Sequence, residues 1–85
     1  MNIETYAKLI GTTVTELRSK SRKAEIVKKR QILSYSLLKM GYTSTEIGAM
    51  IDRHHSTILH SKAEGEKLLK WMRYEKDHKL LMSYA

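Results

Sequence analysis

The sequence contains no cysteine, no proline and no phenylalanine. Without cysteine, the chain has no disulfide framework, no thiolate nucleophile and no cysteine-based zinc finger. Without proline, no helix has to be kinked or broken by one. Runs of Val, Ile and aromatic residues that favour strands are also missing. These absences predict an all-α protein and fit a reducing compartment.

Other absences limit the class of protein. With 85 residues, the chain is shorter than an ATPase, a kinase or a dinucleotide-binding module requires. No apolar stretch approaches the roughly 20 residues of a membrane span. The amino terminus also lacks the basic flank and apolar run of a signal peptide. We expect one cytoplasmic domain over residues 1–85 that is not an enzyme.

Apolar residues recur at helical spacing, and glycines separate the segments. Gly11 and Gly41 stand where helices end in a left-handed residue, and two Thr-x-x-Glu motifs at 13–16 and 43–46 match capping boxes. Gly65 argues against one unbroken helix over residues 64–84. The predicted helices cover residues 2–10, 14–17, 24–40, 47–51, 54–59 and 64–84. The expected fold is all-α with five to six helices, including a C-terminal helical extension over 64–85.

The net charge of +7 is concentrated in one segment. From Arg18 to Arg30, seven basic residues stand against one acidic residue, Glu25. Cations at the start of a helix oppose its macrodipole, so an external anion would offset their cost. A DNA phosphate backbone is such an anion, whereas a solvated helix face is the alternative interpretation.

Arg30 falls in line with the apolar stripe of the long predicted helix, between Ile26 and Leu33. One interpretation is an arginine whose stem lies on the core and whose head reaches water. The other is a guanidinium held by packing so that it projects into a DNA groove. The spacing alone favours neither.

Residues 44–61 have the pattern of a helix-turn-helix. Gly48 is small where a second helix must cross closely, and the apolar residues Ile47, Ile51 and Ile58 are spaced to share a core. The second helix begins with compact donors and acceptors that suit base edges and phosphates. These are His54, His55, Ser56 and Thr57, with His60 one turn further on.

The histidines also allow other chemistry. They could ligate zinc, or His55 and Ser56 could form a base and a nucleophile. However, no HExxH motif, cysteine or suitably spaced carboxylate completes such a site. We therefore expect no metal, no cofactor and no catalysis. Trp71 lies among leucines and is interpreted as core or as part of a partner-binding face.

Four blocks of sequence occur in a characteristic order: VTELRSKSR at 14–22, KRQ at 29–31, EIG at 46–48 and RHHSTILH at 53–60. In order and approximate spacing, they resemble the C-terminal DNA-binding domain of the bacterial replication initiator DnaA. The last block is the most specific, being close to the family signature R-D-H-S/T-T-V-L-H. The resemblance covers roughly residues 3–69.

The resemblance implies a fold related to the Trp repressor and double-stranded DNA as the partner, without nucleotide or membrane. It implies a recognition helix in the major groove and an arginine of the long helix in the minor groove. Carried onto this chain, the predicted base-reading residues are Arg30, His54, His55 and Ser56. The predicted DNA-backbone contacts are Arg22, Lys23, Lys28, Lys29, Ser44, Arg53, Thr57, His60 and Lys62.

The chain departs from the family pattern at the turn and at the residue after it. His54 stands where the family has an acidic residue. A carboxylate only accepts hydrogen bonds and can therefore bind the cytosine amine, whereas a neutral imidazole can either donate or accept one. The standard box should therefore be read poorly at that position. Asp52 stands where the family has a longer Gly-Gly turn.

These observations predict a stand-alone, sequence-specific DNA-binding module that acts in replication initiation control or transcription regulation, associated with the nucleoid. The alternative is a protein-interaction module that keeps the fold but binds little DNA. In that case the apolar C-terminal helix would bind a protein partner or a second copy of the chain.

Overall fold

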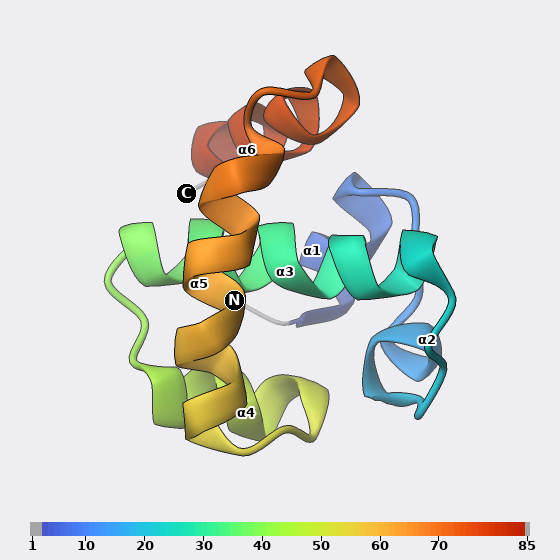
Figure 1. The fold of residues 1–85 in the computed structure, drawn as a ribbon, viewed down its shortest axis with the longest axis vertical. Coiled ribbons are helices and arrows are strands. Elements are labelled where there is room, and N and C mark those ends of the chain that lie inside the picture. The colour runs from blue at the N-terminus through green and yellow to red at the C-terminus, as the bar shows by residue number, and fades with distance from the viewer. Residues whose placement is uncertain (1–2, 85) are drawn as a thin grey trace.

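A computed structural model describes residues 3–84, which form six helices joined by short turns (Figure 1). No strand occurs within these residues, so the predicted all-α class is confirmed. No helix in the same range is long and apolar enough to cross a membrane. The helices are α1 Ile3–Leu9, α2 Val14–Arg18, α3 Ala24–Lys39, α4 Ser44–Ile51, α5 His55–Leu68 and α6 Met72–Tyr84.

Local sequence signals set most of the helix ends. Gly11 and Gly41 have φ angles of 74° and 103°, the left-handed conformation predicted for residues that follow a helix. The capping box at the start of α4 is complete, because Thr43 and Glu46 each accept a hydrogen bond from the other's backbone N–H. These short-range contacts explain why the C-terminal ends of α1, α3 and α4 lie close to the predicted ones. Helix α4 begins at Ser44, directly after its cap Thr43, and so earlier than the predicted residue 47.

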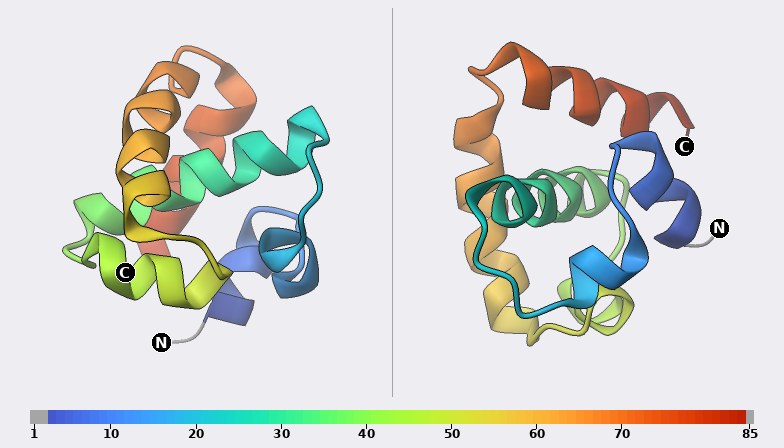
Figure 2. Two further views of the ribbon diagram at one scale, coloured as in Figure 1. Left: turned by 60° about the horizontal axis from the view of Figure 1, so that its bottom comes forward. Right: turned by 90° about the vertical axis from the view of Figure 1, so that its right-hand side faces the viewer.

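Helix α3 lies at the centre of the molecule, and the other helices surround it (Figures 1 and 2). Its buried Leu33 and Leu37 belong to the larger of two apolar clusters, which includes side chains from every helix. Ile32 and Tyr35, on another side of α3, form the smaller cluster with Leu68 of α5 and Tyr74 of α6. Both clusters therefore include residues of α6, so the C-terminal helix is part of the core.

The C-terminal segment is interrupted, but not at Gly65. Helix α5 continues through Gly65 to Leu68, and the chain turns at residues 69–71 before α6 begins. Gly65 is buried in α5, and α5 crosses α3 (Figure 1). A Cβ atom there would lie 2.4 Å from the carbonyl oxygen of Gln31 and 2.7 Å from the Cβ of Tyr35. The glycine is therefore required by a close helix crossing.

Substituting Gly65 by alanine should destabilise the protein by about 1–3 kcal/mol, because the added methyl group overpacks the α3–α5 crossing. At an exposed helix position, the same change would stabilise by roughly 1 kcal/mol. Urea denaturation measures the change in the free energy of unfolding, and the sign of this change therefore tests the close approach of α3 and α5. Glu66→Ala on the exposed face is the matched control and should change stability by less than about 0.5 kcal/mol. A more stable Gly65→Ala protein would contradict the close approach.

Polar contacts also attach α6 to α3. Lys29 Nζ lies 2.6 Å from Asp77 Oδ2, and the two side chains are only 10% and 11% exposed. Ser36 Oγ lies 2.7 Å from Nδ1 of His78, where burial lowers the pKa of the imidazole. The helix is therefore held by hydrogen bonds as well as by apolar packing.

Trp71 is not a core residue. It is 55% exposed in the turn before α6, so the core interpretation is wrong. Met72 beside it is 84% exposed, and three further apolar side chains are exposed towards the end of α6. These three are Leu80, Met82 and Tyr84.

Candidate nucleic-acid interface

Helices α4 and α5 are joined by a tight turn over residues 52–54. Asp52 adopts the left-handed conformation at φ 55° and ψ 55°, which Asp tolerates better than most residues. The next amide, of Arg53, donates to the carbonyl of Gly48 at 2.8 Å. A Cβ atom on Gly48 would lie 2.3 Å from the carbonyl oxygen of Arg53, so only glycine lets the turn fold back this closely. The shortened turn thus forms a helix-turn-helix.

The first turn of α5 presents polar side chains to solvent. His54, His55, Ser56 and Thr57 are all exposed, whereas Ile58 is fully buried and anchors the helix. The ring of His54 caps the helix, since its Nδ1 accepts a hydrogen bond from the backbone N–H of Ser56 at 3.2 Å. The first turn of α5 is therefore held in place by its cap and by the buried Ile58, while its polar side chains are exposed to solvent.

The connector between α2 and α3, residues 19–23, lies beside this helix-turn-helix (Figure 2). Arg53 donates to the carbonyls of Arg18 and Ser19, the first at 3.4 Å. In return, Nε of Arg18 donates to the carbonyl of Met50 at 2.9 Å. These contacts join the basic connector to the turn that precedes α5.

Arg30 holds the same connector from the other side. Its guanidinium donates to backbone carbonyls at the end of α2 and in the connector: Leu17 at 2.9 Å, Ser21 at 2.8 Å, Glu16 at 3.1 Å, and Ser19. The residue is 8% exposed, and burial together with the nearby charge of Arg53 lowers the pKa of Arg30. Arg30 thus donates to two carbonyls at the C-terminal end of α2, where carbonyls lack helical partners.

The geometry is that of a helix-turn-helix whose second helix is flanked by an ordered basic connector. A family model described as a bacterial dnaA protein helix-turn-helix matches residues 3–64. The chain belongs to this family. No curated protein and no solved structure matches the chain. The family match confirms the resemblance found in the sequence. It ends within α5, so α6 lies beyond it.

In this DnaA-type domain, the position of the Arg30 guanidinium matches neither of the two interpretations drawn from the sequence. Its head neither reaches water nor projects outward, because five hydrogen bonds hold it against the connector. A minor-groove contact would require several of these bonds to break. The spacing placed Arg30 on the apolar face of its helix, but the connector residues that it contacts, Ser21 and Ser19, lie 9 and 11 residues away in sequence.

Lys29 is also enclosed by other parts of the chain. It was predicted to contact the DNA backbone, but its ammonium group is buried against Asp77 of α6. It also lies 5.8 Å from the centre of the Tyr74 ring. A contact between Lys29 and a phosphate would therefore require this ion pair to open.

Most other predicted residues lie near the connector or along the outer face of α5. Arg22, Lys23, Thr57, His60 and Lys62 are exposed, whereas Lys28 and Ser44 are half-buried. Lys20 was counted in the basic segment but was not predicted as a contact. It is exposed in the connector and forms no ion pair with any residue of the described range 3–84.

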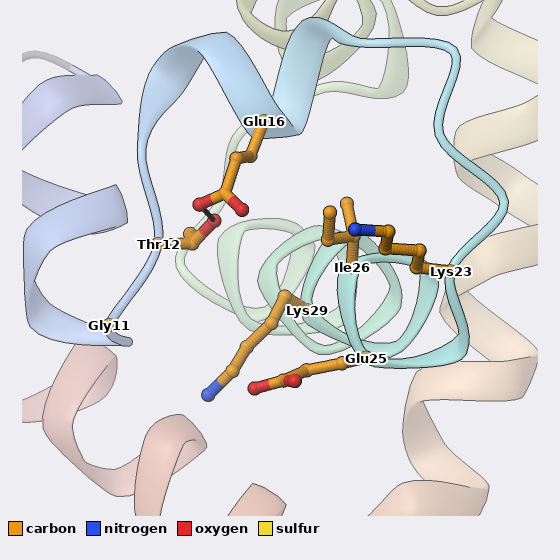
Figure 3. A pocket seen from close by; sticks show the side chains of 7 residues that line it. All are labelled: Gly11, Thr12, Glu16, Lys23, Glu25, Ile26 and Lys29. Carbon is orange, nitrogen blue, oxygen red and sulfur yellow. Dashed lines mark hydrogen bonds between the residues drawn. The ribbon is translucent and has the colours of Figure 1, made fainter.

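A pocket of about 220 Å³ lies between the α1–α2 turn and the start of α3 (Figure 3). Its charged side chains are Lys23 and Lys29 against Glu16 and Glu25, so the pocket has no excess charge. Glu16 accepts a hydrogen bond from the Thr12 hydroxyl at 3.1 Å. Nothing in this lining favours phosphate over a neutral ligand. Among residues 3–84, no group of three His, Cys, Asp or Glu side chains is arranged to hold a metal ion.

Proposed function

We propose that this DnaA-type domain binds double-stranded DNA with sequence preference, through the first turn of α5 in the major groove. The observation that carries the proposal is the exposed turn His54 to Thr57, joined by Arg53 to the basic connector. Residues 55–63 of α5 contain no acidic side chain. The connector then lies over the adjacent phosphates, with base contacts from His54, His55 and Ser56.

We expect the phosphate contacts to come from five lysine and arginine side chains that have no ion-pair partner in the described part of the chain. They are Lys20, Arg22, Lys23, Lys28 and Lys62. If about five phosphates are neutralised, affinity should fall roughly 10²–10³-fold between 50 and 200 mM salt. Fluorescence anisotropy with a duplex selected from a random pool measures this slope. A flat salt dependence would contradict the proposal.

Two substitutions separate base contacts from backbone contacts. His55→Ala should weaken the free energy of binding to the selected duplex by about 1–3 kcal/mol and relax the sequence preference at the base that His55 contacts. Lys23→Ala should weaken selected and random duplexes alike and reduce the salt slope by about one. Lys79→Ala on α6 is the matched control, since this lysine lies beside Glu75 and should leave binding unchanged. If His55→Ala reduced the affinity for the selected and the random duplex equally, the result would contradict a base contact.

We further propose that this binding serves control of replication initiation or of transcription on the nucleoid. The family match supports sites of the initiator type. Mapping of the protein on the chromosome distinguishes the two roles, because clustered sites at an origin favour the first and scattered promoter sites favour the second.

A second candidate function is protein interaction through the exposed apolar side chains of Trp71, Met72 and the end of α6. An exposed apolar patch commonly marks an interaction site. Two results together would favour this function over DNA binding. The protein would self-associate and become monomeric on Trp71→Ser, and it would bind no duplex in a salt-sensitive way.

A further inference from the structure

The cap of α5 determines which nitrogen of His54 carries a proton. Nδ1 lies 3.2 Å from the backbone nitrogen of Ser56, and the geometry is that of a hydrogen bond from this N–H. Because a backbone N–H can only donate, Nδ1 must accept and carries no proton. In the neutral ring, the proton is therefore on Nε2.

The Ser56 side chain agrees with this assignment. Its Oγ lies 2.7 Å from the same Nδ1. With no proton on Nδ1, the hydroxyl is the donor of this contact, and the hydroxyl and the backbone N–H of Ser56 share the one lone pair of that nitrogen. The ring of His55 lies 4.2 Å from that of His54, centre to centre, and limits how the capping ring can turn. The orientation of His54 is thus determined by three contacts within one helical turn.

The protonated edge of the ring points away from the cap. Nδ1 and Nε2 lie on opposite sides of an imidazole, and His54 is exposed. No partner for Nε2 occurs among the hydrogen bonds of residues 3–84. The outward group is consequently a free N–H donor at the start of the helix that we propose enters the major groove.

We infer that His54 is a specificity-determining residue that donates from Nε2–H to an acceptor on a base edge. This inference rests on the proposed function. In the major groove, guanine O6 and N7, adenine N7 and thymine O4 accept, whereas cytosine N4 and adenine N6 donate. Cytosine is the only base that offers a donor and no acceptor, so a carboxylate at this position would favour cytosine, whereas the donor of His54 selects against it. For a G·C pair, the two preferences correspond to opposite orientations of the pair.

Two substitutions of His54 retain the helix cap but differ in whether the side chain can donate a hydrogen bond to a base. Asn and Asp are both strong helix caps, but an Asn amide can also donate, whereas an Asp carboxylate only accepts. In selections from a random duplex pool, the wild type and His54→Asn should select against cytosine at one shared position. His54→Asp should prefer cytosine to guanine there, with a change of about tenfold in the relative affinity for these two bases. His54→Ala should lose the preference at that position alone.

The tautomer can be tested without DNA. Nitrogen-15 NMR of the free protein should show His54 protonated at Nε2. Protonation at Nδ1 in the neutral ring would overturn the inference while leaving the proposed DNA binding intact. A His54→Asp protein with the wild-type base preference, or a His54→Asn protein that behaves like His54→Ala, would also overturn it. A wild-type protein that binds no duplex in a salt-sensitive way would overturn both proposals.

Discussion

Replacing Arg30 by alanine should lower the free energy of unfolding by about 2–4 kcal/mol, since hydrogen bonds to a charged group are strong and buried acceptors would lose their partner. The substitution removes donors from carbonyls of both α2 and the connector. With the connector released, Lys20, Arg22 and Lys23 would no longer be held beside α5. Affinity should therefore fall on selected and random duplexes alike, measured by anisotropy below the unfolding transition.

Arg30→Lys distinguishes this role from a groove contact. A lysine keeps the charge, but its single ammonium group cannot reach carbonyls on several sides, so stability should fall nearly as far as with alanine. Arg22→Ala is the matched control: this arginine is exposed, so DNA affinity should decrease while stability changes by less than about 0.5 kcal/mol. If Arg30→Ala left stability unchanged and weakened only the selected duplex, Arg30 would be the minor-groove contact that the resemblance implies.

The sequence predicted the elements of this fold because their ends depend on neighbouring residues. Gly41 adopts a conformation that few other residues accept, and Thr43 and Glu46 complete a cap within four residues. The helix-turn-helix was predictable for the same reason, because Gly48 and Asp52 meet the requirements of one short turn. The family resemblance then gave the order of these elements a function.

The partners of charged side chains could not be predicted in this way. Arg30 and Lys29 are neighbours in a basic run, yet one bonds backbone carbonyls of the connector and the other a carboxylate 48 residues away. Periodicity identifies the buried face of a helix but not what covers it. The same limit applies to Gly65, whose close neighbour is the backbone of α3.

The buried ion pair gives the largest expected effect on stability. Asp77→Asn should destabilise the protein by about 3–5 kcal/mol, because it leaves the ammonium of Lys29 buried without a counter-charge. Thermal and urea unfolding measure the loss. Because α6 lies beyond the family match, the result also tests whether residues after 64 are an integral part of this fold.

The double substitution Lys29→Met with Asp77→Leu is the matched control, since apolar residues of similar volume can replace a buried ion pair with little loss. It should recover most of the stability lost in Asp77→Asn. Because Lys29 is enclosed by α6 and does not contact phosphate in our proposal, the double variant should also keep the salt slope of DNA binding. A slope reduced by about one would show that Lys29 reaches the DNA backbone after all, and that the ion pair opens when DNA binds.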